Sequence, residues 1–197
     1  MSLNRPENPS HRGHGHRTWL HLLPQDPEFV PSPDQVGATG RLLVDSGLAI
    51  LGSDPETLLP GPAFAQLLIP GQLPLAGIAR GEVRVESGVL RCYPDPGPEG
   101  FDTQPAPSYV AACPSCGTQL EFFRLRFPNP DPMQAACPKC QQELDVAQLS
   151  WSPRLPVARA EVTFGDLNGR PSLHTCGFPE RLEELWETSV IEVHVTL

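Results

Sequence analysis

The chain has little of what several common protein classes require. Lysine occurs once, at Lys139, and 14 basic residues stand against 23 acidic ones, for a formal net charge of −9. Phosphate binding requires clustered positive charge, so we expect no nucleic-acid partner. No apolar run approaches the length that spans a membrane, and the first residues contain no apolar core of a secretory signal. We therefore expect a cytoplasmic protein without a membrane contact.

Catalytic motifs are also missing. The sequence contains no HExxH motif, no phosphate-binding glycine loop, no dinucleotide fingerprint and no Ser, His and Asp in a hydrolase order. The acidic residues between Glu180 and Glu187 are typical of the solvated face of a helix, because nothing isolates two carboxylates in an apolar setting. No catalytic residue is predicted from these patterns.

Four of the six cysteines form two matching pairs, Cys113 with Cys116 and Cys137 with Cys140. Each CxxC pair places two thiolates on one tight turn, and two such turns supply the four soft ligands that tetrahedral zinc prefers. Twenty residues separate the pairs, at the upper edge of the spacing expected for such sites. We predict a structural zinc site made by these four cysteines, with iron as the alternative because the same four thiolates can hold it.

The first pair reads CPxCG in full, and residues 109–151 resemble the zinc-ribbon, or rubredoxin-like, class of four-cysteine modules. In that class the glycine takes a positive φ, which lets backbone N–H groups turn toward the sulfurs, and Gly117 matches it. Gln141 stands where the second glycine is usual, so a strained or differently shaped turn is expected there. The resemblance implies a ligand set and a local fold, and carries no activity with it.

Two other interpretations of the cysteines fit less well. A thioredoxin-like redox pair needs one CxxC at the start of a helix and does not explain a second copy at this distance. A disulfide framework suits an even number of cysteines but belongs to secreted chains. A metal site is therefore the prediction.

Helices and strands are expected on both sides of the ribbon. Ser32 with Pro33 and Gln35 predicts a capped helix that ends near Gly47, and a second helix is predicted to begin near Pro179. Period-two patterns predict strands at 18–23, 81–92, 160–164 and 190–197. The fold class is then α+β, with helices packed on an antiparallel sheet and a small zinc ribbon inserted between two α+β portions.

The expected organisation has five parts, of which the last packs with the second. They are a disordered tail with histidines (1–16), an α+β portion (17–92), a proline-rich linker (93–108), the ribbon (109–151) and a second α+β portion (152–197).

Two functional hypotheses follow. The first is a non-catalytic zinc-binding protein whose structural ribbon supports interaction with a protein partner. The second is an enzyme with a site between the α+β portions that uses His174 and Cys176, since a histidine two residues from a thiol can form a nucleophile pair. Cys176 beside Gly177 and Phe178, and Cys92 in a strand, are expected to be packing residues. The absence of a catalytic motif favours the first hypothesis.

Overall fold

The structure is a computed structural model of the chain, and it describes residues 17–53, 57–64, 82–94, 109–126, 133–168, 173 and 176–196. The predicted tail (1–16), most of the predicted linker (93–108) and His174 lie outside the described residues. Neither of the two helices in the described part is long and apolar enough to cross a bilayer.

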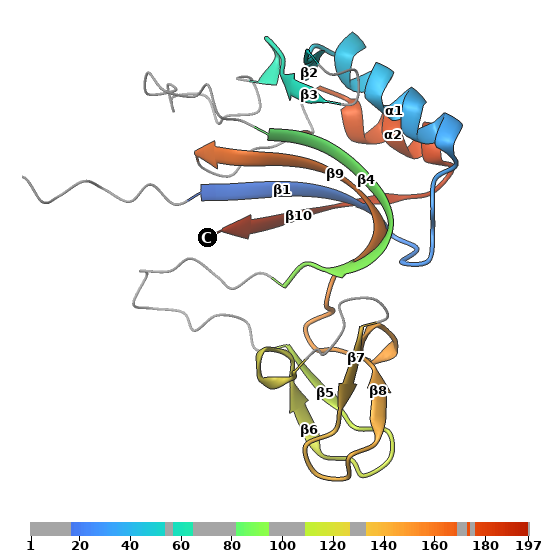
Figure 1. The fold of residues 1–197 in the computed structure, drawn as a ribbon, viewed down its shortest axis with the longest axis vertical. Coiled ribbons are helices and arrows are strands. Elements are labelled where there is room, and N and C mark those ends of the chain that lie inside the picture. The colour runs from blue at the N-terminus through green and yellow to red at the C-terminus, as the bar shows by residue number, and fades with distance from the viewer. Residues whose placement is uncertain are drawn as a thin grey trace, which may run out of the picture.

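A six-stranded antiparallel sheet is the centre of the larger lobe (Figure 1). In their order across the sheet the strands are β10 (Val190–Thr196), β1 (Arg17–Pro24), β9 (Val157–Asn168), β4 (Glu82–Cys92), β3 (Leu58–Pro60) and β2 (Ala49–Leu51). Helices α1 (Pro33–Asp45) and α2 (Phe178–Trp186) contribute to one hydrophobic core with residues of this sheet. The predicted α+β class, with helices on an antiparallel sheet, is confirmed.

The four central strands are connected through the two helices in a known pattern. β1, α1 and β4 form one βαβ unit, and β9, α2 and β10 form another, while β9 lies between β1 and β4 in the sheet. This arrangement is the split βαβ, ferredoxin-like topology. The short hairpin of β2 and β3 extends the sheet beyond β4, and residues 93–156 are inserted between β4 and β9.

Helix α1 begins as its sequence predicts. The Ser32 hydroxyl accepts a hydrogen bond from the backbone N–H of Gln35 at 3.3 Å, and the Gln35 side chain accepts one from the N–H of Ser32 at 2.9 Å. This reciprocal capping box satisfies two N–H groups that would otherwise have no partner at the helix start. Gly47, at φ 70°, follows the last turn, where a left-handed residue costs glycine little.

Helix α2 anchors the core through Trp186, which is 1% exposed. The indole N–H donates to the hydroxyl of Thr39 at 2.9 Å, and that hydroxyl donates to the carbonyl of Gln35 at 2.8 Å. The two helices therefore share a hydrogen bond as well as an apolar contact, and the polar edge of the indole is satisfied where it is buried.

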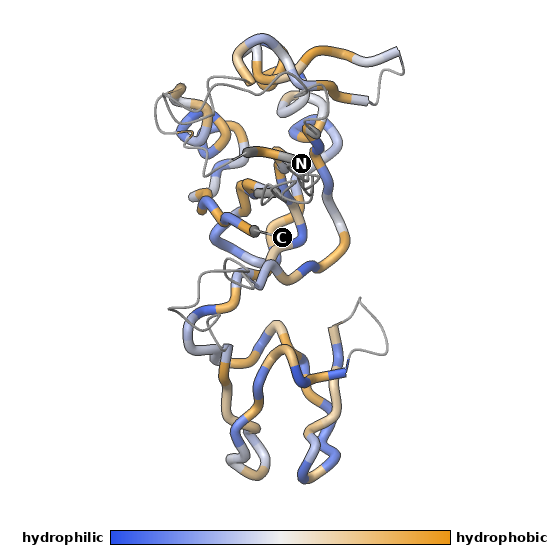
Figure 2. Tube along the Cα trace, turned by 90° about the vertical axis from the view of Figure 1, so that its left-hand side faces the viewer, coloured by the Kyte–Doolittle hydropathy of each residue, from blue (hydrophilic) through white to orange (hydrophobic). Residues whose placement is uncertain are grey.

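The ribbon is a second, smaller lobe below the sheet in Figures 1 and 2, and it consists of two hairpins that lie side by side. They pair β5 (Val110–Ala112) with β6 (Gln119–Glu121), and β7 (Gln134–Ala136) with β8 (Glu143–Asp145). Each hairpin is followed by a single 3₁₀ turn, η2 (Phe122–Arg124) and η3 (Val146–Gln148). Both hairpins belong to one hydrophobic cluster, so the ribbon has a core of its own.

The two lobes join where β4 ends and β9 begins. Cys92 pairs with Val157 across the two strands, and both side chains pack against the ribbon core. The Cys92 sulfur lies 3.0 Å from the Met133 sulfur, and the N–H of Tyr93 donates to the carbonyl of Pro156 at 3.0 Å. The chain therefore enters the ribbon from the end of β4 and returns from it into β9, where these two strands are paired.

Candidate metal centre

The four predicted ligands come together at the tips of the two ribbon hairpins. Strand β5 ends at Ala112 and delivers Cys113, and a turn places Cys116 one residue before Gly117. Strand β7 delivers Cys137 and Cys140 in the same way. All four sulfur atoms lie within 4.8 Å of one another, and they are the one group of three or more His, Cys, Asp or Glu in the described part of the chain that is arranged to hold a metal ion.

Two sulfur separations between the hairpins match those of a tetrahedral metal site. Cys113 Sγ lies 3.8 Å from Cys140 Sγ, and Cys116 Sγ lies 3.7 Å from Cys137 Sγ, so each of these separations joins one hairpin to the other. Four sulfurs about 2.3 Å from a central zinc ion are about 3.8 Å apart in an ideal tetrahedron. A disulfide would require about 2.05 Å. The residues present therefore fit a tetrathiolate metal ion, and all four cysteines are free thiols.

The two hairpins reach this geometry with the same backbone. In the first, the N–H of Gly117 donates to the carbonyl of Cys113 at 2.9 Å, and the N–H of Cys113 donates to the carbonyl of Thr118 at 2.9 Å. In the second, Gln141 and Cys137 make the equivalent bonds, also at 2.9 Å. Each hairpin therefore presents its two sulfurs on the same kind of turn.

Gln141 adopts the conformation that Gly117 adopts. Its φ is 60°, against 67° for Gly117. One of the two expectations from the sequence, a differently shaped turn, is therefore wrong. The other expectation, strain, agrees with the observed angle, because a residue with a Cβ is disfavoured in the left-handed region.

Hydrogen bonds to the sulfurs favour the thiolate form. The Thr118 hydroxyl and then the Thr118 backbone N–H lower the pKa of Cys116 to about 6. The backbone N–H of Cys140, with that of Lys139, lowers the pKa of Cys137. N–H groups that point at metal-bound thiolates stabilise their charge and fix their orientation. The turns therefore supply the polar surroundings that a metal site needs.

Cys140 shows why four such thiolates require a cation. The backbone N–H of Gln142 acts to lower its pKa, but burial and the three neighbouring cysteine sulfurs outweigh that bond and raise the pKa to about 12. Four negative charges within 4.8 Å of one another repel strongly unless a positive ion lies between them. A divalent metal ion would provide that charge, and its binding would release the thiol protons.

Apolar residues hold the two hairpins together behind the sulfurs. Leu120 and Leu144 occupy equivalent positions in β6 and β8 and are 1% and 2% exposed. Trp151 closes the same cluster, and its indole N–H donates to the carbonyl of Val146 at 2.8 Å. Ser152 then forms a β-bridge with Val110, so the chain leaving the ribbon runs back along β5.

Cys92 and Cys176 lie outside the metal centre, and one of them differs from the expectation that both are packing residues. Cys92 is half-buried, and burial raises the pKa of its thiol to about 12. Cys176 is exposed, so the expectation that it is a buried packing residue is wrong. The reason lies in the start of α2: Phe178 fills the core at 0% exposure, while Cys176 sits in the preceding turn with its S–H directed at the carbonyl of Leu173, 3.1 Å away.

A cluster of polar side chains lies on the sheet face away from the helices, and the sequence did not predict it. The Glu161 carboxylate is 5% exposed and accepts bonds from Arg91 at 2.6 Å, Thr163 at 2.6 Å and His21 Nδ1 at 2.8 Å. Burial acts to raise the pKa of Glu161, but these donors, His21 first, lower it to about 2. The alternating pattern of β9 puts Glu161 on the face opposite the apolar residues of that strand. The pattern does not show which residues contact Glu161, because they are distant in the sequence.

His21 follows the predicted tail with histidines (1–16) closely in the sequence. In the structure its ring contacts Glu161 and Thr163 and lies 4.8 Å from the ring of Tyr93. The tail histidines lie outside the described residues. His21 therefore belongs to the polar cluster of the sheet.

No family model matches this chain, and no curated protein or solved structure matches it. The candidate metal centre therefore rests on its geometry alone.

Proposed function

We propose that this chain is a non-catalytic zinc-binding protein, in which Cys113, Cys116, Cys137 and Cys140 hold one structural Zn²⁺. The observation that carries the proposal is the separation of the sulfurs across the two hairpins, 3.8 Å and 3.7 Å, which suits a tetrahedral ion. Four protein thiolates fill the coordination sphere of zinc and leave no position for substrate or water. A closed site of this kind supports folding rather than catalysis.

The proposed role of the zinc is to hold the two hairpins of the ribbon (109–151) together. A module of about forty residues buries too little apolar surface to be stable alone, and metals commonly supply the missing free energy. Free thiols and a tetrathiolate site require a reducing environment, in line with a cytoplasmic location. The excess of acidic residues argues against nucleic acid, so the partner class in this proposal is protein.

Phe123 supports a protein-binding role for the ribbon. Its ring is 55% exposed and packs edge-on against Phe122, with centroids 5.5 Å apart, and against Tyr109 at 6.2 Å. An aromatic side chain held rigidly at the surface is the kind of group that protein interfaces favour. Arg124, beside it, pairs with Glu121 at 2.9 Å and adds charge to the same surface.

The experiment is metal analysis of the purified chain and two variants. We expect about one zinc per wild-type chain, loss of the metal in Cys116→Ser, and full retention in Cys176→Ser, which removes an exposed thiol outside the site. A red colour with iron in place of zinc would show the alternative metal. A metal-free chain with a Cys113 to Cys116 disulfide would refute the proposal.

The structural role is tested by amide exchange with and without a chelator. We expect chelation to remove the protection of Leu120 and Leu144 while the amides of β1 and β9 keep theirs, because only the ribbon depends on the ion. Equal protection of the ribbon in both conditions would show that the metal is not structural.

A further inference from the structure

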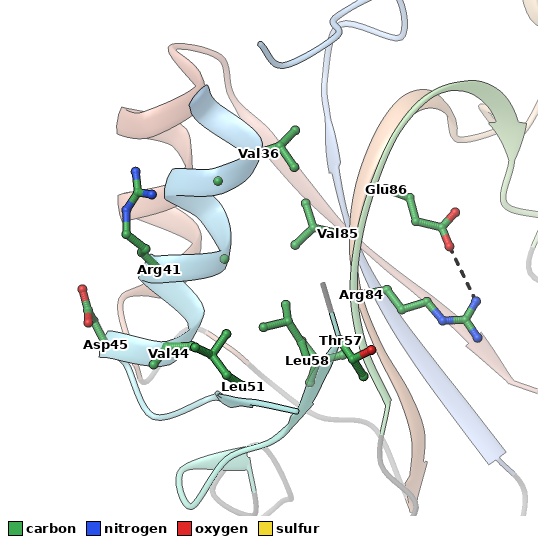
Figure 3. A pocket seen from close by; sticks show the side chains of 13 residues that line it. Val36, Arg41, Val44, Asp45, Leu51, Thr57, Leu58, Arg84, Val85 and Glu86 are labelled. Carbon is green, nitrogen blue, oxygen red and sulfur yellow. Dashed lines mark ion pairs between the residues drawn. The ribbon is translucent and has the colours of Figure 1, made fainter. Parts of the chain in front are cut away.

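Nucleophilic side chains of the described part gather in the ribbon. A groove of about 890 Å³ lies between α1, the β2–β3 hairpin and β4, and Val36 and Val85 point into it (Figure 3). No cysteine or histidine is among the residues that line this groove. The four sulfurs of the candidate metal centre, in contrast, lie within 4.8 Å of one another at the hairpin tips. The reactivity that the proposed function leaves unused is therefore that of these thiolates.

The four cysteines differ in how far solvent reaches them. Cys113 and Cys137, the first cysteine of each hairpin, are 2% and 0% exposed, and Cys116 is half-buried. Cys140 is exposed. Because a thiolate reacts according to its access to the reagent, an oxidant in solution meets Cys140 first.

Hydrogen bonds to the sulfurs show the same difference between the hairpins. Thr118 and Gln142 occupy equivalent positions, two residues after Cys116 and Cys140. Thr118 directs its hydroxyl as well as its N–H at Cys116. Gln142 directs its backbone N–H at Cys140, but its side-chain amide donates to the carbonyl of Glu143 at 3.2 Å. Stabilising the charge of a thiolate lowers its nucleophilicity, so Cys140 lacks the hydroxyl that restrains Cys116.

The other hairpin supplies a second sulfur for Cys140. Cys113 Sγ lies 3.8 Å from Cys140 Sγ. An approach of about 1.8 Å would bring the two sulfurs to the bond length of a disulfide, about 2.05 Å. Cys113 is buried, so it can reach an oxidised Cys140 more readily than it can reach an oxidant in solvent. The two sulfurs therefore suit two different steps of an oxidation.

From these observations we propose that the metal centre releases its zinc in response to a hydroperoxide. Cys140 is the thiolate that attacks the peroxide, and Cys113 is the thiolate that converts the product into a disulfide. The inference rests on the proposed zinc site and adds a regulation to it. Zinc coordination keeps both sulfurs deprotonated, which is the form that reacts.

The reaction has two steps. The Cys140 thiolate attacks one oxygen of hydrogen peroxide, the O–O bond breaks, and hydroxide leaves a sulfenic acid on Cys140. The Cys113 thiolate then attacks the Cys140 sulfur, the S–S bond forms, the S–O bond breaks, and a second hydroxide leaves. Two electrons pass from the two thiolates to the peroxide, and the two hydroxides take two protons from solvent to become water.

Oxidation of this pair removes two of the four ligands, and zinc requires four. Cys116 and Cys137 remain as thiols, 3.7 Å apart. The new disulfide joins the same two hairpins that the ion joined, so the ribbon stays crosslinked while the metal leaves. Reduction by a dithiol restores the four thiolates and allows zinc to bind again.

The test uses the zinc-loaded full chain carrying Cys176→Ser, which removes an exposed thiol that would otherwise consume peroxide. Hydrogen peroxide is added in equal amount, and a chromogenic zinc indicator records the zinc that is set free. We expect about one zinc released for each peroxide consumed. Peptide mapping by mass spectrometry should find a disulfide between Cys113 and Cys140. Addition of dithiothreitol and zinc should restore the metal content.

Two matched variants of this chain test the role of exposure. Cys140→His and Cys116→His each replace the second cysteine of one hairpin and leave three thiolates with an imidazole, a ligand set that holds zinc. We expect Cys140→His to release zinc about tenfold more slowly than the parent chain, or more slowly still. Cys116→His keeps the pair of Cys113 and Cys140, so its rate should stay within about twofold of the parent.

Three outcomes would overturn the inference. One is zinc that stays bound at peroxide concentrations that fully oxidise N-acetylcysteine in the same buffer. Another is a first disulfide within one hairpin, Cys113 with Cys116 or Cys137 with Cys140, and this measurement needs no histidine variant. The third is equal release of zinc from the two histidine variants. A chain that holds no zinc before peroxide is added would refute the proposed zinc site and the inference with it, whereas zinc that stays bound refutes the inference alone.

Discussion

Glu161 makes the free energy of unfolding depend on pH, and the size of this effect can be measured. Its pKa is lowered from 4.5 to about 2. A carboxyl whose pKa falls on folding contributes stability above its unfolded pKa and loses it as the pH drops through its folded pKa. At about 1.4 kcal/mol per pH unit, the contribution at pH 7 is about 3 kcal/mol, of which about 2 kcal/mol is lost by pH 3. Because the group is 5% exposed, solvent screens this effect little.

The assay is urea unfolding, followed by circular dichroism at several pH values, of wild type and Glu161→Gln. We expect the difference in unfolding free energy between the two proteins to shrink by about 2 kcal/mol from pH 7 to pH 3, because glutamine does not titrate. Zinc release in acid affects both proteins and cancels in the difference. Thr163→Val removes one donor to the carboxylate and should lower the stability at pH 7 by about 1 kcal/mol. Parallel pH curves for wild type and Glu161→Gln would refute the reasoning.

Three other predictions follow from single positions. Gln141→Gly should stabilise the zinc-loaded ribbon by about 1 kcal/mol in chelator titrations, since it relieves a left-handed residue with a Cβ, whereas Gly117→Gln should destabilise it by a similar amount. Trp186→Ala should lower the free energy of unfolding by about 3 to 5 kcal/mol in urea, because it empties a site in the core; a loss below about 1 kcal/mol would place the indole outside it. With zinc bound, Cys176 should react first with iodoacetamide and Cys92 slowly, as mass spectrometry of the labelled peptides would show, and equal rates would contradict their burial.

Local patterns in the sequence were sufficient for the features that depend on neighbouring residues. The capping box of α1 involves Ser32 and Gln35, three residues apart, and the CxxC pairs each lie on one turn, so short-range spacing predicts both. The cysteine pattern also predicted that the four thiols meet at one site, and all four sulfur atoms do lie within 4.8 Å of one another.

The polar cluster could not be predicted in the same way. Glu161 is 70 residues from Arg91 and 140 from His21, and nothing in either neighbourhood shows that the three meet. The alternation in β9 predicts that Glu161 faces away from the helices, but an exposed carboxylate and a buried, paired one have the same pattern.

The exposure of Cys176 follows from the orientation of one turn, which residue type does not determine.

The position of the ribbon also has a consequence for folding kinetics. β4 and β9 must find each other across residues 93–156, whereas an ordinary hairpin closes across a few residues. The entropy of closing a loop grows with the logarithm of its length, by about 0.6 kcal/mol per doubling. A zinc ion that joins Cys113 to Cys140 early would shorten the loop to somewhat more than half, and would therefore favour the pairing of the two longest strands by less than about 1 kcal/mol. Zinc should accelerate folding of the sheet only slightly, and the two lobes should assemble nearly as independent units.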